Sequence, residues 1–305
     1  MYYNALSPYL KARFGGKVYK LVLSSGCTCP NRDGSILLED GTANFGGCTF
    51  CTGSGEFAAS GLVSIPEQLE QAKFILGKKG RNARYIAYFQ ENTNTYGPVS
   101  RLEPLFRAAM EPDDVVALSI ATRPDCLGPD ILAMLARLHA VKPVWVELGL
   151  QTIHEATAAR IRRGYPLSVF DKAVRDLHAI GVEVIVHLIL GLPGETEADM
   201  KASARYVGRC GAEGVKLHLL HILHGTPMAA DYAVGRVRTL ELDAYIALLE
   251  RCLEVLPPEV VIHRLTGDAP KRDLLAPLWS ADKKRVLNAI RQRFEADDLI
   301  QGSKL

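Results

Sequence analysis

Three cysteines near the N-terminus have the residue type and spacing of a metal centre. Cys29 is followed by Pro-Asn-Arg-Asp-Gly, while Cys48 and Cys51 stand two residues apart behind a Gly-Gly pair. Thiolates are soft ligands that suit zinc or iron–sulfur clusters. Three thiolates leave one corner of a four-iron cluster open for chemistry, whereas Cys27 as a fourth ligand would give a closed zinc or electron-transfer site. From spacing alone, an open cluster, zinc and other sites are equally favoured.

Length, composition and charge limit the kinds of protein in which these cysteines could lie. The chain has 305 residues, 48% of them hydrophobic, and a net charge of +2. This length lies within the range of an α/β barrel, and the charge gives no bulk attraction to nucleic acid or membrane. No apolar run approaches the ~20 residues of a membrane span, and the N-terminus lacks the core of a signal peptide. We therefore expect a cytoplasmic protein whose seven cysteines form no disulfide framework.

Short β-branched runs alternate with amphipathic stretches along the first two thirds of the chain. The predicted strands are Lys17–Ser24, Arg84–Phe89, Val115–Ile120, Val144–Leu150, Val182–Leu190 and Val215–Leu220. The predicted helices are Pro66–Leu76, Leu102–Met110, Pro129–His139, His154–Ile161, Val169–Ile180 and Glu197–Cys210. Strand–helix units in series favour a parallel sheet with outer helices, and right-handed crossovers curl it into a barrel or partial barrel.

Unusual polar clusters follow most of the predicted strands. They are the cysteine loop, Gln90 to Thr95, Ala121 to Asp125, Gln151-Thr152, Gly191 to Thr196 and His221 to Pro227. Active sites of parallel α/β sheets lie at the carboxyl ends of the strands. The sequence therefore predicts that these clusters meet at one rim.

The pattern changes near residue 235. A helix at Leu240–Val255, a strand at Val260–Arg264 and a final helix at Asp282–Phe294 are predicted. We expect a catalytic barrel with its N-terminal lead-in over residues 1–235, and a small C-terminal α/β extension over residues 236–305 that closes the barrel.

The segment from Cys29 to Cys51 resembles the cluster motif of radical S-adenosylmethionine (radical SAM) proteins. More narrowly it is similar to the YhcC/YtqA-type group, relatives of the Elongator catalytic subunit. The resemblance continues through Tyr88 to Tyr96, Ser119 to Asp125, Glu147 to Thr152 and His187 to Glu195. Several linked motifs in one order make it specific to the family.

The resemblance implies a (β/α)6 partial barrel and a radical enzyme. Cys29, Cys48 and Cys51 would hold a [4Fe–4S] cluster whose fourth iron chelates S-adenosylmethionine. Reductive cleavage would give methionine and a 5′-deoxyadenosyl radical that takes hydrogen from the substrate, with an electron donor such as flavodoxin or ferredoxin. Cys27 remains an alternative ligand.

The resemblance also implies which residues bind the cofactor. They are Phe50, Gln90, Asn92, Thr93, Arg123, Gln151, Arg163 and His187. Phe50 would pack beside adenine, Gln151 would reach the ribose, and Arg163 would meet the carboxylate. Arg163 is equally well read as a cation at a helix C-terminus, and a lone strand histidine such as His187 is more often a core residue.

Three histidines, His218, His221 and His224, recur at three-residue intervals after the sixth predicted strand. A shared face would require a helix, whereas this segment reads as strand and loop. Substrate contact and packing are favoured over a second metal.

The substrate is not fixed by these patterns. The relationship to the Elongator subunit implies modification of tRNA wobble uridines, with a small molecule or peptide as the alternative. Two other classes are a non-enzymatic iron–sulfur electron carrier and a zinc-stabilised RNA-binding protein. Both leave the polar clusters at the rim unexplained.

Overall fold

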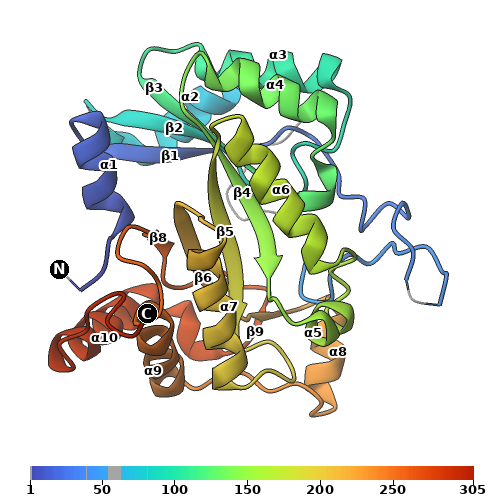
Figure 1. Cartoon of the computed structure of the whole chain (residues 1–305), viewed down its shortest axis with the longest axis vertical. Coiled ribbons are helices and arrows are strands. Elements are labelled where there is room, and N and C mark those ends of the chain that lie inside the picture. The colour runs from blue at the N-terminus through green and yellow to red at the C-terminus, as the bar shows by residue number, and fades with distance from the viewer. Residues whose placement is uncertain (1, 39, 54–62, 81) are drawn as a thin grey trace.

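The computed structural model describes residues 2–38, 40–53, 63–80 and 82–305. Its centre is a seven-stranded parallel sheet in the order β1-β2-β3-β4-β5-β6-β8, curved into a half-barrel (Figure 1). The strands are β1 (Val18–Leu23), β2 (Arg84–Phe89), β3 (Val115–Thr122), β4 (Val144–Gln151), β5 (Glu183–Leu190), β6 (Gly214–Leu219) and β8 (Val261–Arg264). The predicted parallel sheet and partial barrel are confirmed.

Helices cover the outer face of the sheet. They are α2 (Ile65–Leu76), α3 (Val99–Met110), α4 (Pro129–His139), α5 (Glu155–Arg160), α6 (Leu167–Ala179) and α7 (Glu197–Arg209). Local signals set their ends: Ser64 and Thr196 form capping boxes at α2 and α7, and Pro129 occupies the first turn of α4. Helix α3 begins earlier than predicted because Pro98 is its N-cap.

The two faces of the sheet differ because side chains alternate along each strand. Outward positions are apolar and pack against the helices, as with Val146, Val186 and Leu217. Inward positions near the start of the strands are also apolar, and Leu10 of α1 (Leu6–Phe14) packs against Trp145 there. Helix α1 therefore plugs one end of the half-barrel, and the polar inward residues lie farther along the strands.

The C-terminal part is built onto the same sheet. It comprises β7 (Ile222–Leu223), α8 (Pro227–Ala233), α9 (Leu242–Leu253), β9 (Leu274–Ala276), a 3₁₀ turn at Leu278–Ala281 and α10 (Lys283–Ala296). Further 3₁₀ turns of the described residues lie earlier in the chain, at Gly77–Gly80 and Pro124–Cys126. Strand β8 pairs with β6, α9 packs against α7, and β7 pairs with β9. The division at residue 235 stays a prediction.

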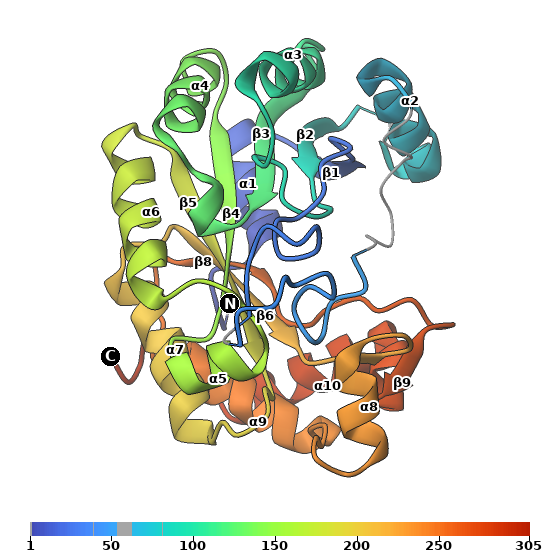
Figure 2. The same ribbon diagram turned by 90° about the vertical axis from the view of Figure 1, so that its right-hand side faces the viewer.

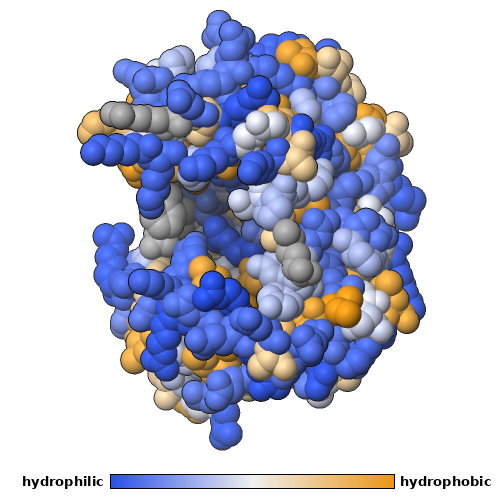
Figure 3. Space-filling view, turned by 90° about the vertical axis from the view of Figure 1, so that its left-hand side faces the viewer, coloured by the Kyte–Doolittle hydropathy of each residue, from blue (hydrophilic) through white to orange (hydrophobic). Residues whose placement is uncertain are grey.

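The loop after β1 lies across the mouth of the half-barrel. Figure 2 shows it in blue near the middle of the view, between α2–α4 above and α8–α10 below. Hydrophilic side chains dominate the face in Figure 3, where apolar ones form small separate patches. Within the described ranges, no helix combines the length and apolarity that crossing a bilayer requires.

Candidate active site

A cavity of about 390 Å³ lies inside the half-barrel at the carboxyl ends of the strands. Its lining includes every cysteine and cofactor-contact residue predicted from the sequence: Cys29, Cys48, Cys51, Phe50, Gln90, Asn92, Thr93, Arg123, Gln151, Arg163 and His187. The predicted convergence is therefore confirmed for the polar clusters after β1, β2, β3, β4 and β6, whereas no residue of Gly191 to Thr196 lines the cavity. Individual roles are a separate matter and depend on the contacts of each residue.

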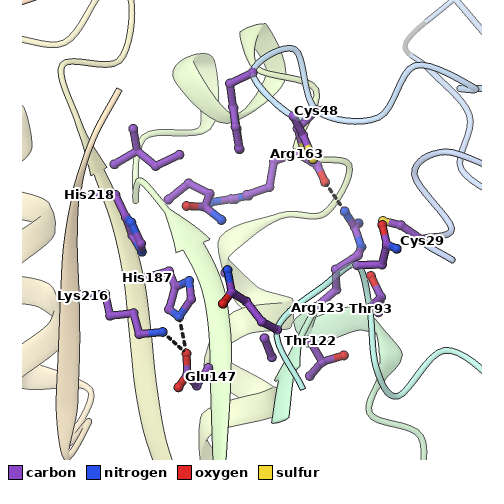
Figure 4. A pocket seen from close by; sticks show the side chains of 18 of the residues that line it. Cys29, Cys48, Thr93, Thr122, Arg123, Glu147, Arg163, His187, Lys216 and His218 are labelled. Carbon is purple, nitrogen blue, oxygen red and sulfur yellow. Dashed lines mark hydrogen bonds and ion pairs between the residues drawn. The ribbon is translucent and has the colours of Figure 1, made fainter. Parts of the chain in front are cut away.

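The three predicted ligand cysteines lie on one side of the cavity (Figure 4). Asn31 holds Cys48 in place, since its Nδ2 donates to Cys48 Sγ at 3.3 Å and to Arg162 O at 2.7 Å. The backbone N–H of Gly53 donates to Cys51 Sγ at 3.3 Å. Hydrogen-bond donors at the sulfur atoms stabilise thiolates and tune a cluster that they carry.

Cys27 faces elsewhere. It is buried, and Arg101 Nη2 donates to its Sγ at 2.7 Å, while the thiol is absent from the lining of the cavity. The neighbouring Cys29 does line the cavity. The structure therefore assembles three thiols there, and the four-thiolate alternative is not formed.

The chemistry of the donor set fits an iron–sulfur cluster. Burial, and then the neighbouring Cys51, raise the pKa of the Cys48 thiol to about 12, so a bound metal must supply the positive charge that makes it a thiolate. Among the described residues, no three His, Cys, Asp or Glu side chains are close enough to hold one metal ion. Three thiols around one cavity match instead the ligand number of a four-iron cluster with one iron left open.

The end of β4 carries backbone strain that aims a side chain into the site. Gln151 has φ of 67°, and the pairing of β4 with β5 shifts register between Gly149 and Gln151. A Cβ atom at Gly149 would lie 2.7 Å from Gln151 Nε2, so a larger residue there would displace the amide end of this side chain. Asn92 also lines the cavity with a positive φ of 55°. Left-handed non-glycine residues cluster at functional sites.

The two arginines of the predicted site are engaged in local structure. Arg163 is buried, and its guanidinium donates to the carbonyls of Leu150, Thr152 and Tyr165. Arg123 donates to the carboxylate of Asp125 and to Arg163 O. Arg163 therefore fixes the loop after β4, and its contact with a cofactor carboxylate stays a prediction.

Asn94, which sequence reasoning missed, joins two loops to two strand ends. Its Nδ2 donates to Phe89 O and Ala121 O, and its Oδ1 accepts from Ser25 Oγ at 2.6 Å. The loops after β1 and β2 are thereby held to the ends of β2 and β3, beside Thr93. The sequence feature that could have identified Asn94 is its position in a polar run directly after a buried strand.

Glu147 is the second residue that the sequence did not single out. It is fully buried, and its carboxylate accepts from Lys20 Nζ at 2.6 Å, Ser119 Oγ at 2.7 Å, His187 Nε2 at 2.8 Å and Lys216 Nζ. Although burial raises the pKa of Glu147, Lys20 and Lys216 hold it well below its usual value. The sequence feature that could have identified this network is the presence of charged residues at inward positions of otherwise apolar strands.

The histidines separate into two groups. His187, His218 and His221 line the cavity, with the rings of His187 and His218 5.1 Å apart. His224 is exposed and outside the lining. Burial lowers the pKa of His221 to about 4 and that of His218 well below its usual value, so both rings are neutral near pH 7. The three-residue spacing of His218, His221 and His224 thus falls on a strand and the loop after it, and does not place the three side chains on one face.

Comparison with known proteins agrees with this geometry. The model of the radical SAM superfamily matches residues 44–207, and that of the radical SAM C-terminal domain matches residues 212–296. The chain is 42% identical to the uncharacterized protein YtqA of Bacillus subtilis, over 98% of this chain and 92% of that protein. It is 38% identical to protein YhcC of Escherichia coli, over 99% and 95%.

More distant relatives match half of the chain. Elongator complex protein 3 of Schizosaccharomyces pombe is 27% identical over 51% of this chain and 28% of its own length. The tRNA uridine(34) acetyltransferase of Methanocaldococcus jannaschii is 28% identical over 51% and 29%.

Solved structures share the fold. The archaeal Elp3 of Methanocaldococcus infernus superposes with a TM-score of 0.70 at 17% identity, over 93% of this chain and 64% of that one. Members of the superfamily use a [4Fe–4S] cluster and S-adenosylmethionine, the pair that the three thiols and their cavity fit. The chain belongs to the radical SAM superfamily, in the YhcC/YtqA-type group related to the Elongator catalytic subunit.

Proposed function

We propose that the protein cleaves S-adenosylmethionine reductively at a cluster held by Cys29, Cys48 and Cys51, and abstracts hydrogen from a substrate bound in the same cavity. One observation carries the proposal: these thiols share a cavity with the polar inward side chains of β2 to β6. A closed electron-transfer site would not need such a chamber beside its metal.

The bound cofactors would supply the radical chemistry, and the chain would supply position and shielding. Asn31 fixes Cys48, and Gln151 extends into the cavity from a strained backbone. In the Glu147 network, Lys20, Ser119 and His187 are held in place by hydrogen bonds to one buried carboxylate. These contacts preorganise the site.

The substrate that we propose is a tRNA uridine. The M. jannaschii relative is named for action on a tRNA uridine, and the chain shares half its own length with it. Arg160 and Arg162 are exposed at the end of α5, beside the cysteine loop, and Arg236 lies against Arg160. Exposed arginines at the mouth of a site suit the phosphates of RNA.

The radical step is tested by anaerobic reconstitution with iron and sulfide, followed by reduction in the presence of S-adenosylmethionine. Chromatography should detect 5′-deoxyadenosine with wild type and none with Cys51→Ala. Dithionite serves as the reference reductant, and reduced flavodoxin or ferredoxin should replace it. A cluster that is stable and reducible but never cleaves the cofactor, even with bulk tRNA, would contradict the proposal.

The tRNA step has its own test. Mass spectrometry of nucleosides from a strain lacking the protein should show an altered wobble uridine, restored by the wild-type gene and not by the gene for Cys51→Ala. An unchanged nucleoside profile would remove tRNA as the substrate and leave the radical chemistry standing.

A further inference from the structure

We infer that the side of the cavity formed by β6 and β8 is an anion-binding subsite that takes a carboxylate or phosphate group of the substrate. We define this β6–β8 subsite by Lys216, His218, His221 and Arg264, all of which line the cavity. That its ligand is the substrate rests on the proposed function. That it binds anions rests on the charges and contacts described next.

Positive charge exceeds negative charge around this subsite. The carboxylate of Glu147 is shared by Lys20 and Lys216, and that of Asp268 is shared by Arg264 and Lys283. Of these groups, Lys216, Arg264 and Glu147 line the cavity, so two basic side chains and one carboxylate face it on this side. Excess charge inside a partly buried chamber is costly unless a counter-ion enters, and an anionic group would supply it.

Arg264 is the cation that is best placed to receive the anion. It ends β8, and its one ion pair within the described residues is a 3.4 Å contact from Nη2 to Asp268 Oδ2. No hydrogen bond from its guanidinium to another described residue is formed, in contrast to Arg123 and Arg163 across the cavity. A guanidinium fork with free donors binds carboxylate or phosphate bidentately.

His218 and His221 add polar atoms that lack a partner. The Nε2 atom of each is buried and has no hydrogen-bond partner among the described residues. An unsatisfied buried nitrogen destabilises the protein, and a hydrogen bond to a ligand or a bound water would relieve this cost. Gly267 keeps the space beside both rings open, because a Cβ there would lie 3.0 Å from His221 Cε1.

The β6–β8 subsite is distinct from the place of the cofactor. Figure 4 shows Lys216 and His218 on the opposite side of the pocket from Cys29 and Cys48. An anion at Arg264 would therefore not be the carboxylate of a cofactor bound at the thiols. The reactive part of the substrate would lie between the two sides, where a radical formed near the thiols can reach it.

The test is anaerobic titration calorimetry of the cluster-loaded protein with inorganic phosphate and, separately, with acetate. Arg264→Gln should weaken binding of the preferred anion about ten-fold, which is ~1.4 kcal/mol. Lys283→Gln is the matched control: it also removes one cation from Asp268 but lies outside the cavity lining, so binding should change less than about two-fold. Arg264→Lys should restore binding only in part.

Two results would overturn the inference. The first is that neither anion binds, or that Arg264→Gln and Lys283→Gln weaken anion binding equally. Either outcome would mean that the subsite holds no specific anion. The second is loss of anion binding when S-adenosylmethionine is added, which would place the anion in the cofactor site. If Arg264→Gln does not fold, Lys216→Met replaces it, since Glu147 then keeps Lys20 as its partner.

The two anions identify the group that the substrate carries. Tighter binding of phosphate assigns the subsite to a nucleotide phosphate, and tighter binding of acetate assigns it to a carboxylate. The measurement requires no turnover, so it is independent of the proposed function. Anion binding without cofactor cleavage would contradict the radical proposal and support the subsite. Cofactor cleavage without anion binding would support the radical proposal and contradict the subsite.

Discussion

The two sides of the cavity are built by different means. The cysteine side consists of loops, which hydrogen bonds from Asn31, Asn94 and Arg163 fasten to one another. The β6–β8 subsite and the adjoining Glu147 network consist largely of strand side chains, whose inward direction follows from the alternation along a β-strand. The cysteine side is therefore positioned by hydrogen bonds between segments far apart in the chain, whereas the β6–β8 side is positioned by the strands themselves. Both sides are preorganised, but they depend on different contacts.

The largest effect that we expect contrasts two cysteines of the cluster loop. Cys48→Ala should lose nearly all cluster iron, because it removes one of three thiols at the cavity. Cys27→Ala should retain the iron of wild type, since Cys27 contacts Arg101 instead. Iron content and visible absorption after anaerobic reconstitution measure both. Loss of iron from the Cys27 variant would show that the loop rearranges to use a fourth thiol.

The next effect concerns the buried carboxylate. Glu147→Gln should lower the free energy of unfolding by about 3–5 kcal/mol, because it leaves the buried Lys216 and the half-buried Lys20 without a compensating charge. Denaturant unfolding of the cluster-free protein measures the loss. The double variant Glu147→Gln with Lys216→Met should recover much of it. A single variant as stable as wild type would mean that the lysines are already neutral or hydrated.

A third prediction uses the strained backbone of the cysteine side. Gln151→Gly should raise the free energy of unfolding by about 1 kcal/mol by relieving a positive φ, yet weaken binding of S-adenosylmethionine. Asn82→Gly is the matched control, since Asn82 is exposed with φ of 57° and lies outside the cavity lining. It should be stabilised equally and bind the cofactor as wild type does. Equal affinity in both variants would remove Gln151 from the cofactor site.

The smallest effect concerns Glu103, a half-buried carboxylate paired with two solvent-exposed arginines. Ion pairs with Arg137, and then Arg107, lower the pKa of Glu103 to about 2. A depressed carboxyl pKa stabilises the fold above the unfolded value of about 4.3 and loses that contribution as pH falls toward 2. Because the pair is near solvent, Glu103→Gln should cost only about 1 kcal/mol at pH 7.

Unfolding of Glu103→Gln and wild type at a series of pH values checks this last prediction. The difference between them should shrink between about pH 4.3 and 2. A loss at pH 7 as large as that of Glu147→Gln would contradict the expected difference between a fully buried carboxylate and one whose partners are exposed to solvent.

Much of the architecture could be read from local patterns. The apolar runs placed β2 at Arg84–Phe89 as observed, and capping residues and prolines placed the starts of α4 and α7. The strands β3 and β4 extend beyond prediction to Thr122 and Gln151, because polar residues at a strand end still pair with the neighbouring strand. Hydrophobic period and capping are short-range signals, so one sequence suffices to read them.

The sequence by itself determined that the ligands are thiols, that strands and helices alternate, and that most polar clusters follow the strands at one rim. It could not reveal that Cys27 faces Arg101, or that Lys20, Glu147 and Lys216 meet although they lie on separate strands. Nor could it distinguish Arg264, with free donors, from Arg163, whose donors are occupied. These facts depend on contacts between residues far apart in the chain. Only the curvature of the sheet brings such residues within hydrogen-bonding distance.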